Sequence, residues 1–224
     1  MQYKLVRSKR RTLAITIDGS GNCIVRAPLR LPLGEIHNFI EEKQHWINAK
    51  QREMRLKAEL APAEPLLAEG AVWRIAGNEL QIKINGNAAK NFIGIDGSYI
   101  VCGSGVSQKN FLTFIRKTAL QILQSRTKHF AALTGAAPCG IKLSSAYARW
   151  GSCSGKNVLN FAWRLIFAPP ALIDYVVVHE LCHIGCMNHS ASFWQRVAAV
   201  MPDYEVRRKA LKQYGYVLKW YRDN

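Results

Sequence analysis

The sequence has few acidic residues: 15 aspartates and glutamates stand against 31 lysines and arginines, a formal charge of +16 over 224 residues. It lacks an apolar run near the roughly 18 residues that a membrane-spanning helix needs, which argues against a membrane protein. The beginning of the sequence lacks the apolar core of a signal peptide, and the six cysteines are scattered. We therefore expect a cytoplasmic protein with reduced thiols rather than a small disulfide-stabilised secreted domain.

The composition is that of a globular protein. Hydrophobic residues make up 49% of the chain and charged residues 21%, which is too apolar for a disordered segment. The basic excess is spread over the chain, with 20 basic and 10 acidic residues in 1–141 and 11 and 5 in 142–224. A basic surface favours acidic partners such as nucleic acid or nucleotides, although no nucleic-acid-binding motif is recognisable.

Hydrophobic periodicity predicts a mixed α and β organisation for the first two thirds of the chain. Alternation predicts strands, and apolar residues three and four apart predict helices. The expected elements are a β-hairpin over 3–30 with its turn at 18–22, a helix over 33–60, a connector over 61–65, a β section over 71–102, and a helix over 111–133 closed by Gly135.

The last third has a different pattern. A strand from Ile141 to Cys153, a turn at 154–157 and a strand over 158–166 predict a hairpin. Pro169 and Pro170 suit the first turn of a helix, and the helix predicted over 171–185 is apolar on nearly every face, so it should be buried. We expect a domain over 1–140 and a second over 141–224, packed as one compact unit.

The motif His179-Glu180-Leu181-Cys182-His183 lies in this predicted buried helix. Residues four apart are stacked on one helix face, so both imidazoles can reach one metal ion. The glutamate beside the first histidine is then placed to take a proton from an activated water. The pattern predicts a metal site with Glu180 as the general base.

A third ligand is predicted at His189. A catalytic zinc needs three protein ligands and one open position. In a continuous helix His189 would lie about 9 Å beyond His183 and about 120° around the axis, out of reach. Gly185 and Asn188 favour left-handed helix ends, so the chain can turn there and bring His189 back, with Ser190 capping a new helix. The spacing equals that of the metzincin proteases, whose glycine position is Cys186 here.

The motifs of this sequence resemble those of the YgjP-like metallopeptidase family, a group of bacterial proteins described as predicted metal-dependent hydrolases. The resemblance covers nearly the whole chain, including Ser8-Lys9-Arg10-Arg11-Thr12-Leu13 and Val25-Arg26-Ala27-Pro28 at its beginning. It is most specific in the last third, where the matching segments are Arg149-Trp150-Gly151-Ser152-Cys153, Asn160, Trp163-Arg164-Leu165, Ala168-Pro169-Pro170, Asp174-Tyr175-Val176-Val177, His179-Glu180-Leu181-Cys182-His183, Met187-Asn188-His189-Ser190, Phe193-Trp194 and Pro202-Asp203-Tyr204.

The resemblance implies an α+β fold with a zincin-like catalytic core, made of a β-hairpin and a buried ligand helix and preceded by a β-rich and helical region. It implies one Zn²⁺ per chain, or another divalent metal, held by His179, His183 and His189, with Glu180 as the catalytic base. The family is similar to the SprT-like and WLM peptidases, some of which degrade proteins bound to DNA.

The substrate-binding residues are less sharply defined by the sequence. Arg149, Ser152 and Tyr204 are the candidates for contact with a peptide or protein substrate. Arg149 and Tyr204, like Tyr147 and Tyr175, can also stabilise an oxyanion. The segment 148–152 either binds an extended peptide by strand addition or packs under the ligand helix.

Three functions are compatible with these patterns. The first is a zinc metallopeptidase. The second is a metal-dependent phosphohydrolase acting on nucleotides, which the basic charge suits although no Walker-type phosphate loop is present. The third is a nucleic-acid-associated protein with structural zinc, which would need a fourth protein ligand, for which Cys186 is the local candidate.

Overall fold

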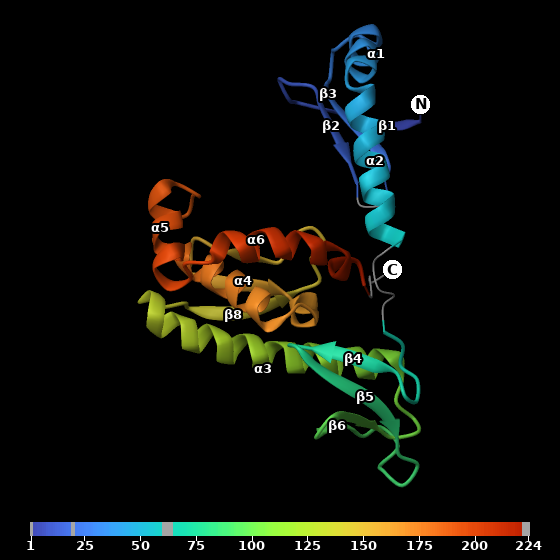
Figure 1. Cartoon of the computed structure of the whole chain (residues 1–224), viewed down its shortest axis with the longest axis vertical. Helices are drawn as coiled ribbons and strands as arrows, with labels where there is room; N and C mark the ends of the chain where they lie inside the picture. The colour runs from blue at the N-terminus through green and yellow to red at the C-terminus, as the bar shows by residue number, and fades with distance from the viewer. Residues whose placement is uncertain (1, 19–20, 60–64, 221–224) are drawn as a thin grey trace. The chain divides into compact units, whose positions relative to one another are not determined.

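The computed structural model describes residues 2–18, 21–59 and 65–220. The chain forms two compact units, Met1–Ala63 and Glu64–Asn224, which are described separately. The secondary structure is mixed, with helices and three small sheets, and the predicted α+β class is confirmed (Figure 1). None of the described helices is both long enough and apolar enough to cross a membrane.

The N-terminal unit is a three-stranded sheet with two helices. Its elements are β1 (Tyr3–Ser8), β2 (Ala14–Ile17), β3 (Cys23–Pro28), α1 (Leu33–Glu42) and α2 (Gln44–Glu59). The predicted hairpin exists as the antiparallel pair β2–β3, while β1 lies on the other side of β3 and pairs with it in parallel. Period-two alternation marks a strand but carries no information about its neighbours, so the position of β1 could not be read from the sequence.

The helix predicted over 33–60 is interrupted. It is divided at Lys43, whose backbone leaves the helical region at φ −93° and ψ 5°, into α1 and α2. Ile36, Ile40 and Ile47 are buried against the sheet on both sides of the break. The predicted connector 61–65 lies, except for Pro65, outside the described residues, as do residues 19 and 20 of the predicted turn.

The second unit begins with a four-stranded sheet covered by a long helix. The strands are β4 (Val72–Ile75), β5 (Asn78–Ile84), β6 (Ile93–Asp96) and β7 (Tyr99–Cys102), in the order β4-β5-β7-β6. The helix α3 spans Gln108–Thr134 and ends, as predicted, at Gly135, which adopts the left-handed conformation at φ +66°. Trp73, Phe111 and Ile115 are fully buried in the core that these elements share with later parts of the chain.

The last third contains a three-stranded sheet in the order β8-β10-β9. Its strands are β8 (Gly140–Ser144), β9 (Gly151–Cys153) and β10 (Val158–Ala162). The prediction of one continuous strand over 141–153 is wrong, because residues 145–150 leave the sheet and carry the chain across β10. β8 pairs with β10 in parallel on one edge, and β9 pairs with it antiparallel on the other. The predicted hairpin is confirmed as β9–β10, with β9 as an edge strand.

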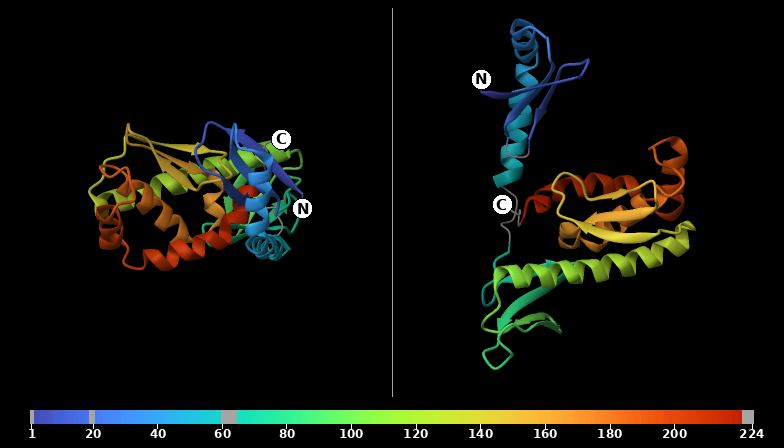
Figure 2. Two further views of the ribbon diagram at one scale, coloured as in Figure 1. Left: turned by 90° about the horizontal axis from the view of Figure 1, so that it is seen from above. Right: turned by 180° about the vertical axis from the view of Figure 1, so that it is seen from behind.

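The apolar helix is buried as predicted. The helix α4 spans Pro170–Cys182, with Pro169 at its N-cap and nine of its thirteen residues buried. It packs against α3, β9, α5 (Ala191–Val200) and α6 (Tyr204–Gln213), and 3₁₀ turns lie at Trp163–Phe167 and Tyr214–Lys219 (Figure 2). Arg126 of α3 donates two hydrogen bonds, of 2.6 and 2.8 Å, to the carboxylate of Asp174 and joins α3 to α4.

The boundary between the two compact units, after Ala63, does not coincide with the division predicted between residues 140 and 141. Residues 64–140 belong to the same unit as α4. Helix α3 packs along α4, and the turn between β4 and β5 lies against the first residue of α4. A Cβ at Gly77 of that turn would lie 2.8 Å from the ring of Pro170. The four-stranded sheet and α3 therefore support the C-terminal third directly.

Candidate metal centre

Three imidazoles converge at the end of the ligand helix. His179 lies in the last turn of α4 and His183 is its C-cap residue, and their Nε2 atoms lie 3.3 Å apart. The α-helix ends at Cys182, and Gly185 then adopts a left-handed conformation at φ +88°, which reverses the chain. This turn brings Nε2 of His189 to 3.0 Å from Nε2 of His179, as the sequence predicted.

The turn occurs at Gly185, one residue before the position at which the metzincin pattern has its glycine. Cys186 follows it and is half-buried. Its carbonyl oxygen accepts a hydrogen bond of 3.0 Å from Nδ1 of His183. With its hydrogen on Nδ1, His183 presents the lone pair of Nε2 to the other two rings, which is the tautomer a metal ligand needs.

The donor set fits a metal ion. The candidate ligand atoms of the three histidines all lie within 4.8 Å of one another, and among the described residues this group contains no cysteine and no carboxylate. Tetrahedral ligands at about 2.05 Å from zinc are separated by roughly 3.3 Å, close to the two Nε2 distances found here. Burial and the neighbouring histidines lower the pKa of His179 to about 3, so its ring is neutral and can donate a lone pair.

Aromatic rings pack against His183 and His189 and restrict the positions of their imidazoles. The ring of Phe193 stacks on His183, with centroids 4.5 Å apart, and the indole of Trp194 stacks on His189 at 5.6 Å. The ring of Tyr204 stacks on Trp194 at 5.2 Å, and the guanidinium of Arg208 lies 4.7 Å from the indole centroid. The sequence analysis did not predict these ring contacts. The spacing of His189 and Phe193, four residues apart at the start of a helix, was the only feature of the sequence that could have indicated them.

Glu180 is buried directly against strand β9. Its side chain is 5% exposed, and burial raises the pKa of its carboxyl group to about 7, while the positive charge of Arg149 acts in the opposite direction. A Cβ placed on Gly151 would lie 2.7 Å from Oε1 of Glu180. Only glycine leaves room for the carboxylate at this position, a requirement that the sequence did not reveal.

The structure places the other residues predicted from the sequence in different surroundings. Arg149 is exposed and acts electrostatically on Glu180, and Ser152 is half-buried on β9 opposite Asn160. Tyr204 belongs to the stack on Trp194, and its hydroxyl donates to Glu205 at 3.3 Å. Tyr175 is buried with its ring 5.9 Å from that of His179, and Tyr147 is 64% exposed. Among the three predicted substrate residues, Arg149 is the one whose positive charge acts on the carboxyl group of Glu180.

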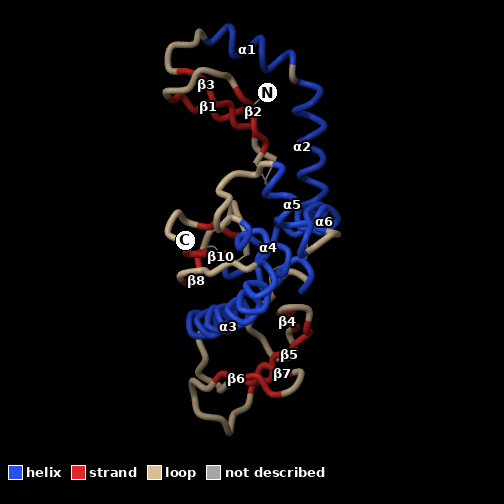
Figure 3. Tube along the Cα trace, turned by 90° about the vertical axis from the view of Figure 1, so that its left-hand side faces the viewer, coloured by secondary structure: helices blue, strands red, loops and turns tan. Residues whose placement is uncertain are grey.

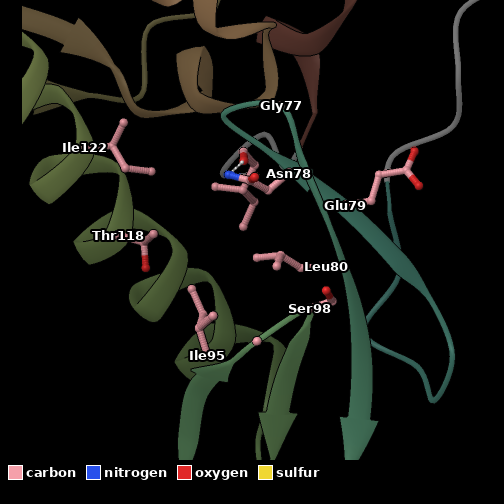
Figure 4. Close-up of a pocket in the computed structure, with 10 residues that line it drawn as sticks. Gly77, Asn78, Glu79, Leu80, Ile95, Ser98, Thr118 and Ile122 are labelled. Atoms are coloured by element: carbon pink, nitrogen blue, oxygen red, sulfur yellow. Dashed lines mark hydrogen bonds between the residues drawn. The ribbon is translucent and has the colours of Figure 1, made fainter.

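A pocket of about 450 Å³ lies elsewhere in this unit, between the turns of the four-stranded sheet and α3 (Figure 4). Ile75, Leu80 and Ile122 form much of its apolar wall, and Asn78 and Ser98 line it with polar groups. None of the histidines of the cluster and none of the predicted substrate residues lines it. The chemistry of the three histidines is therefore separate from this pocket.

Comparison with known proteins gives one family match. The model of the YgjP-like family, metallopeptidase domain, matches residues 11–214. No match was found among curated proteins. Among solved structures, the metallopeptidase zymogen of Pyrococcus abyssi abylysin is similar at 17% sequence identity and a TM-score of 0.39, over 41% of this chain and 93% of that one.

Proposed function

The chain belongs to the YgjP-like family of metallopeptidase domains, and we propose that it is a zinc-dependent peptidase with Glu180 as its general base. In this proposal His179, His183 and His189 hold the metal. The observation that carries it is the convergence of three imidazole Nε2 atoms, at 3.0 and 3.3 Å, on the helix that also carries a buried carboxylate beside its first histidine.

Each group of the site has a distinct task in this proposal. Zinc in a three-histidine site supplies a Lewis acid that lowers the pKa of water and polarises a carbonyl group. Glu180 takes a proton from the attacking water onto its carboxylate and delivers it to the amine nitrogen as the peptide C–N bond breaks. Its burial suits this task, since a carboxyl group with a pKa near 7 both accepts and returns a proton at neutral pH.

The peptide substrate is proposed to bind along β9. This strand is at the edge of its sheet, with β10 on one side only, and it passes beside Glu180. An extended peptide can add to such an edge through main-chain hydrogen bonds. Arg149, two residues before β9, is proposed to stabilise negative charge on the substrate carbonyl oxygen, and Ser152 and Tyr204 are the proposed contacts at the margins of the site.

The composition of the histidine cluster favours a catalytic over a structural metal. A structural zinc site is usually closed by a fourth protein ligand. The Sγ atom of Cys186, the local candidate, contacts the hydroxyls of Ser190 and Ser192 at 3.6 and 3.7 Å, and it is outside the group of converging ligand atoms. The fourth position is therefore proposed to serve water and substrate.

The reaction class is tested by a substrate screen. Purified protein with its metal content measured is incubated with a peptide library, with denatured casein and, separately, with nucleoside triphosphates. We expect new peptide amino termini from the wild type and none from Glu180→Gln. Release of phosphate or pyrophosphate by the wild type alone, without peptide cleavage, would instead establish the phosphohydrolase.

The contact between Gly151 and Glu180 gives a steric prediction. The variant Gly151→Ala places a methyl group 2.7 Å from Oε1, so the carboxylate must shift, and a displacement of about 1 Å can lower the rate by roughly 10²-fold. We expect kcat to fall at least tenfold while bound zinc, measured by atomic absorption, is retained. The matched control is Gly155→Ala, since no atom lies within 4 Å of a Cβ there. Equal rates in the two variants would contradict the prediction.

A further inference from the structure

The positive charge of the N-terminal unit is concentrated in its sheet. Residues 1–32, the part of the sequence that contains the strands and their loops, include seven lysines and arginines and one acidic residue, Asp18. Residues 33–63, which include both helices, contain five basic and five acidic residues. The net charge of +6 therefore belongs to the sheet and its loops, while the helical layer is neutral.

The strands expose one face that the helices do not cover. Alternate residues, among them Val25, Ala27 and Ile17, are buried against α1 and α2, which lie on one side of the strands (Figure 3). The residues between them face the other way, and all are at least partly exposed. We call this surface the basic sheet face; it consists of Lys4, Val6, Ala14, Thr16, Ile24 and Arg26.

The strand register groups the charges of this face. Arg26, in the central strand, lies between Val6 and Ala14, and Lys4 lies beside Ile24 in the next row. The loop from β1 to β2 adds the exposed side chains of Lys9 and Arg11. These four cations form no ion pair with another described residue. Arg7, by contrast, points to the helical side and donates to the carbonyl oxygens of the loop before α1, so it has a structural task.

The side chains and the width of the basic sheet face favour some nucleic acids over others as partners. It contains no aromatic ring, so it offers no platform on which the bases of a single strand could stack. Neighbouring strands of this sheet lie about 4.8 Å apart, and the major groove of B-DNA, about 12 Å wide, admits a ribbon of two such strands. The major groove of duplex RNA is too narrow to admit such an element.

We propose that the basic sheet face and the β1–β2 loop bind duplex DNA through its phosphates. The cations of both are placed to contact the backbone, and the small apolar side chains between them allow close approach to the groove. Binding of this kind is independent of sequence and depends steeply on salt. It does not require the reaction proposed for the metal centre, and it would hold this protein on DNA whatever its substrate.

The test uses the full chain and a labelled 20-base-pair DNA duplex in fluorescence anisotropy. We expect binding in the micromolar range near physiological salt, with log K falling linearly with log salt. The variant Lys4→Gln/Lys9→Gln/Arg11→Gln/Arg26→Gln should weaken binding at least tenfold. It should also flatten the salt slope by about 0.9 for each phosphate that the variant no longer neutralises.

The matched control removes the same number of charges elsewhere, in Lys109→Gln/Lys117→Gln/Lys128→Gln/Lys156→Gln, all at exposed positions of the second unit. We expect it to weaken binding less than twofold, with circular dichroism confirming that both variants are folded. An equal loss in the two variants would overturn the proposal, because it would indicate general charge attraction. Equal or tighter binding of the single strand, of duplex RNA or of polyglutamate would overturn the choice of DNA.

Discussion

Replacing Glu180 with glutamine is expected to abolish turnover while leaving the metal in place. Glutamine has nearly the shape of glutamate, and it can still fill the space beside Gly151, but its amide cannot accept a proton from water. Loss of a positioned general base typically costs 10²- to 10⁴-fold in rate. We expect a fall in kcat of at least about 10²-fold, with KM changed far less.

Three measurements separate this result from simple misfolding. Metal content by atomic absorption should stay near that of the wild type, because Glu180 is not among the converging ligand atoms. The melting temperature should not fall, since burial of a carboxylate is costly and a neutral amide reduces that cost. Turnover at the wild-type rate would remove Glu180 from the mechanism, and loss of metal would identify it as a ligand.

Replacing His189 with alanine is expected to have the largest effect on metal binding. The variant leaves the imidazoles of His179 and His183 at the end of α4 and removes the third one, which the turn at Gly185 brings back to them. Mutation of a residue that only hydrogen-bonds to a metal ligand lowers metal affinity by about 10- to 100-fold. Loss of the ligand itself should therefore lower it by more than about 100-fold. Competition with a chromophoric zinc chelator measures this directly.

The control for this variant is His129→Ala. His129 is exposed on α3 and is not part of the cluster, so its loss should leave the affinity for zinc unchanged. Zinc should raise the melting temperature of the wild type and of His129→Ala, because a ligand that binds only the folded state stabilises it. An undiminished affinity in His189→Ala would place the third ligand elsewhere and refute the proposed site.

The stack on Trp194 explains how an exposed loop can hold His189, the proposed third metal ligand, in a fixed position. His189 is the exposed member of the cluster, and a free loop would lose much binding energy in ordering it. The indole of Trp194 covers one face of its ring and is itself covered by Tyr204. Tyr204, assigned by sequence to the substrate, therefore also belongs to the support of the ligand, and its substrate contact remains part of the proposal.

Local sequence patterns were sufficient to predict α4, the turn that follows it and the hairpin that precedes it. The period of the α-helix alone places His179 and His183 on one face, and glycine's freedom at positive φ predicts the turn that returns His189. The β9–β10 hairpin, the burial of α4 and the end of α3 at Gly135 followed from equally short-range rules. Each depends on the geometry of a few consecutive residues, and that geometry is encoded in their types.

The tertiary structure decided everything that depends on distant neighbours. The parallel pairings of β1 with β3 and of β8 with β10, the break at Lys43 and the transfer of residues 64–140 to the unit of the ligand helix have no local signature. The same holds for Gly151, whose missing side chain makes room for Glu180 only because β9 is folded against α4. The sequence by itself identified the residues proposed to carry the chemistry. Long-range packing, which minimises exposed apolar surface over the whole unit, determined what surrounds and supports them.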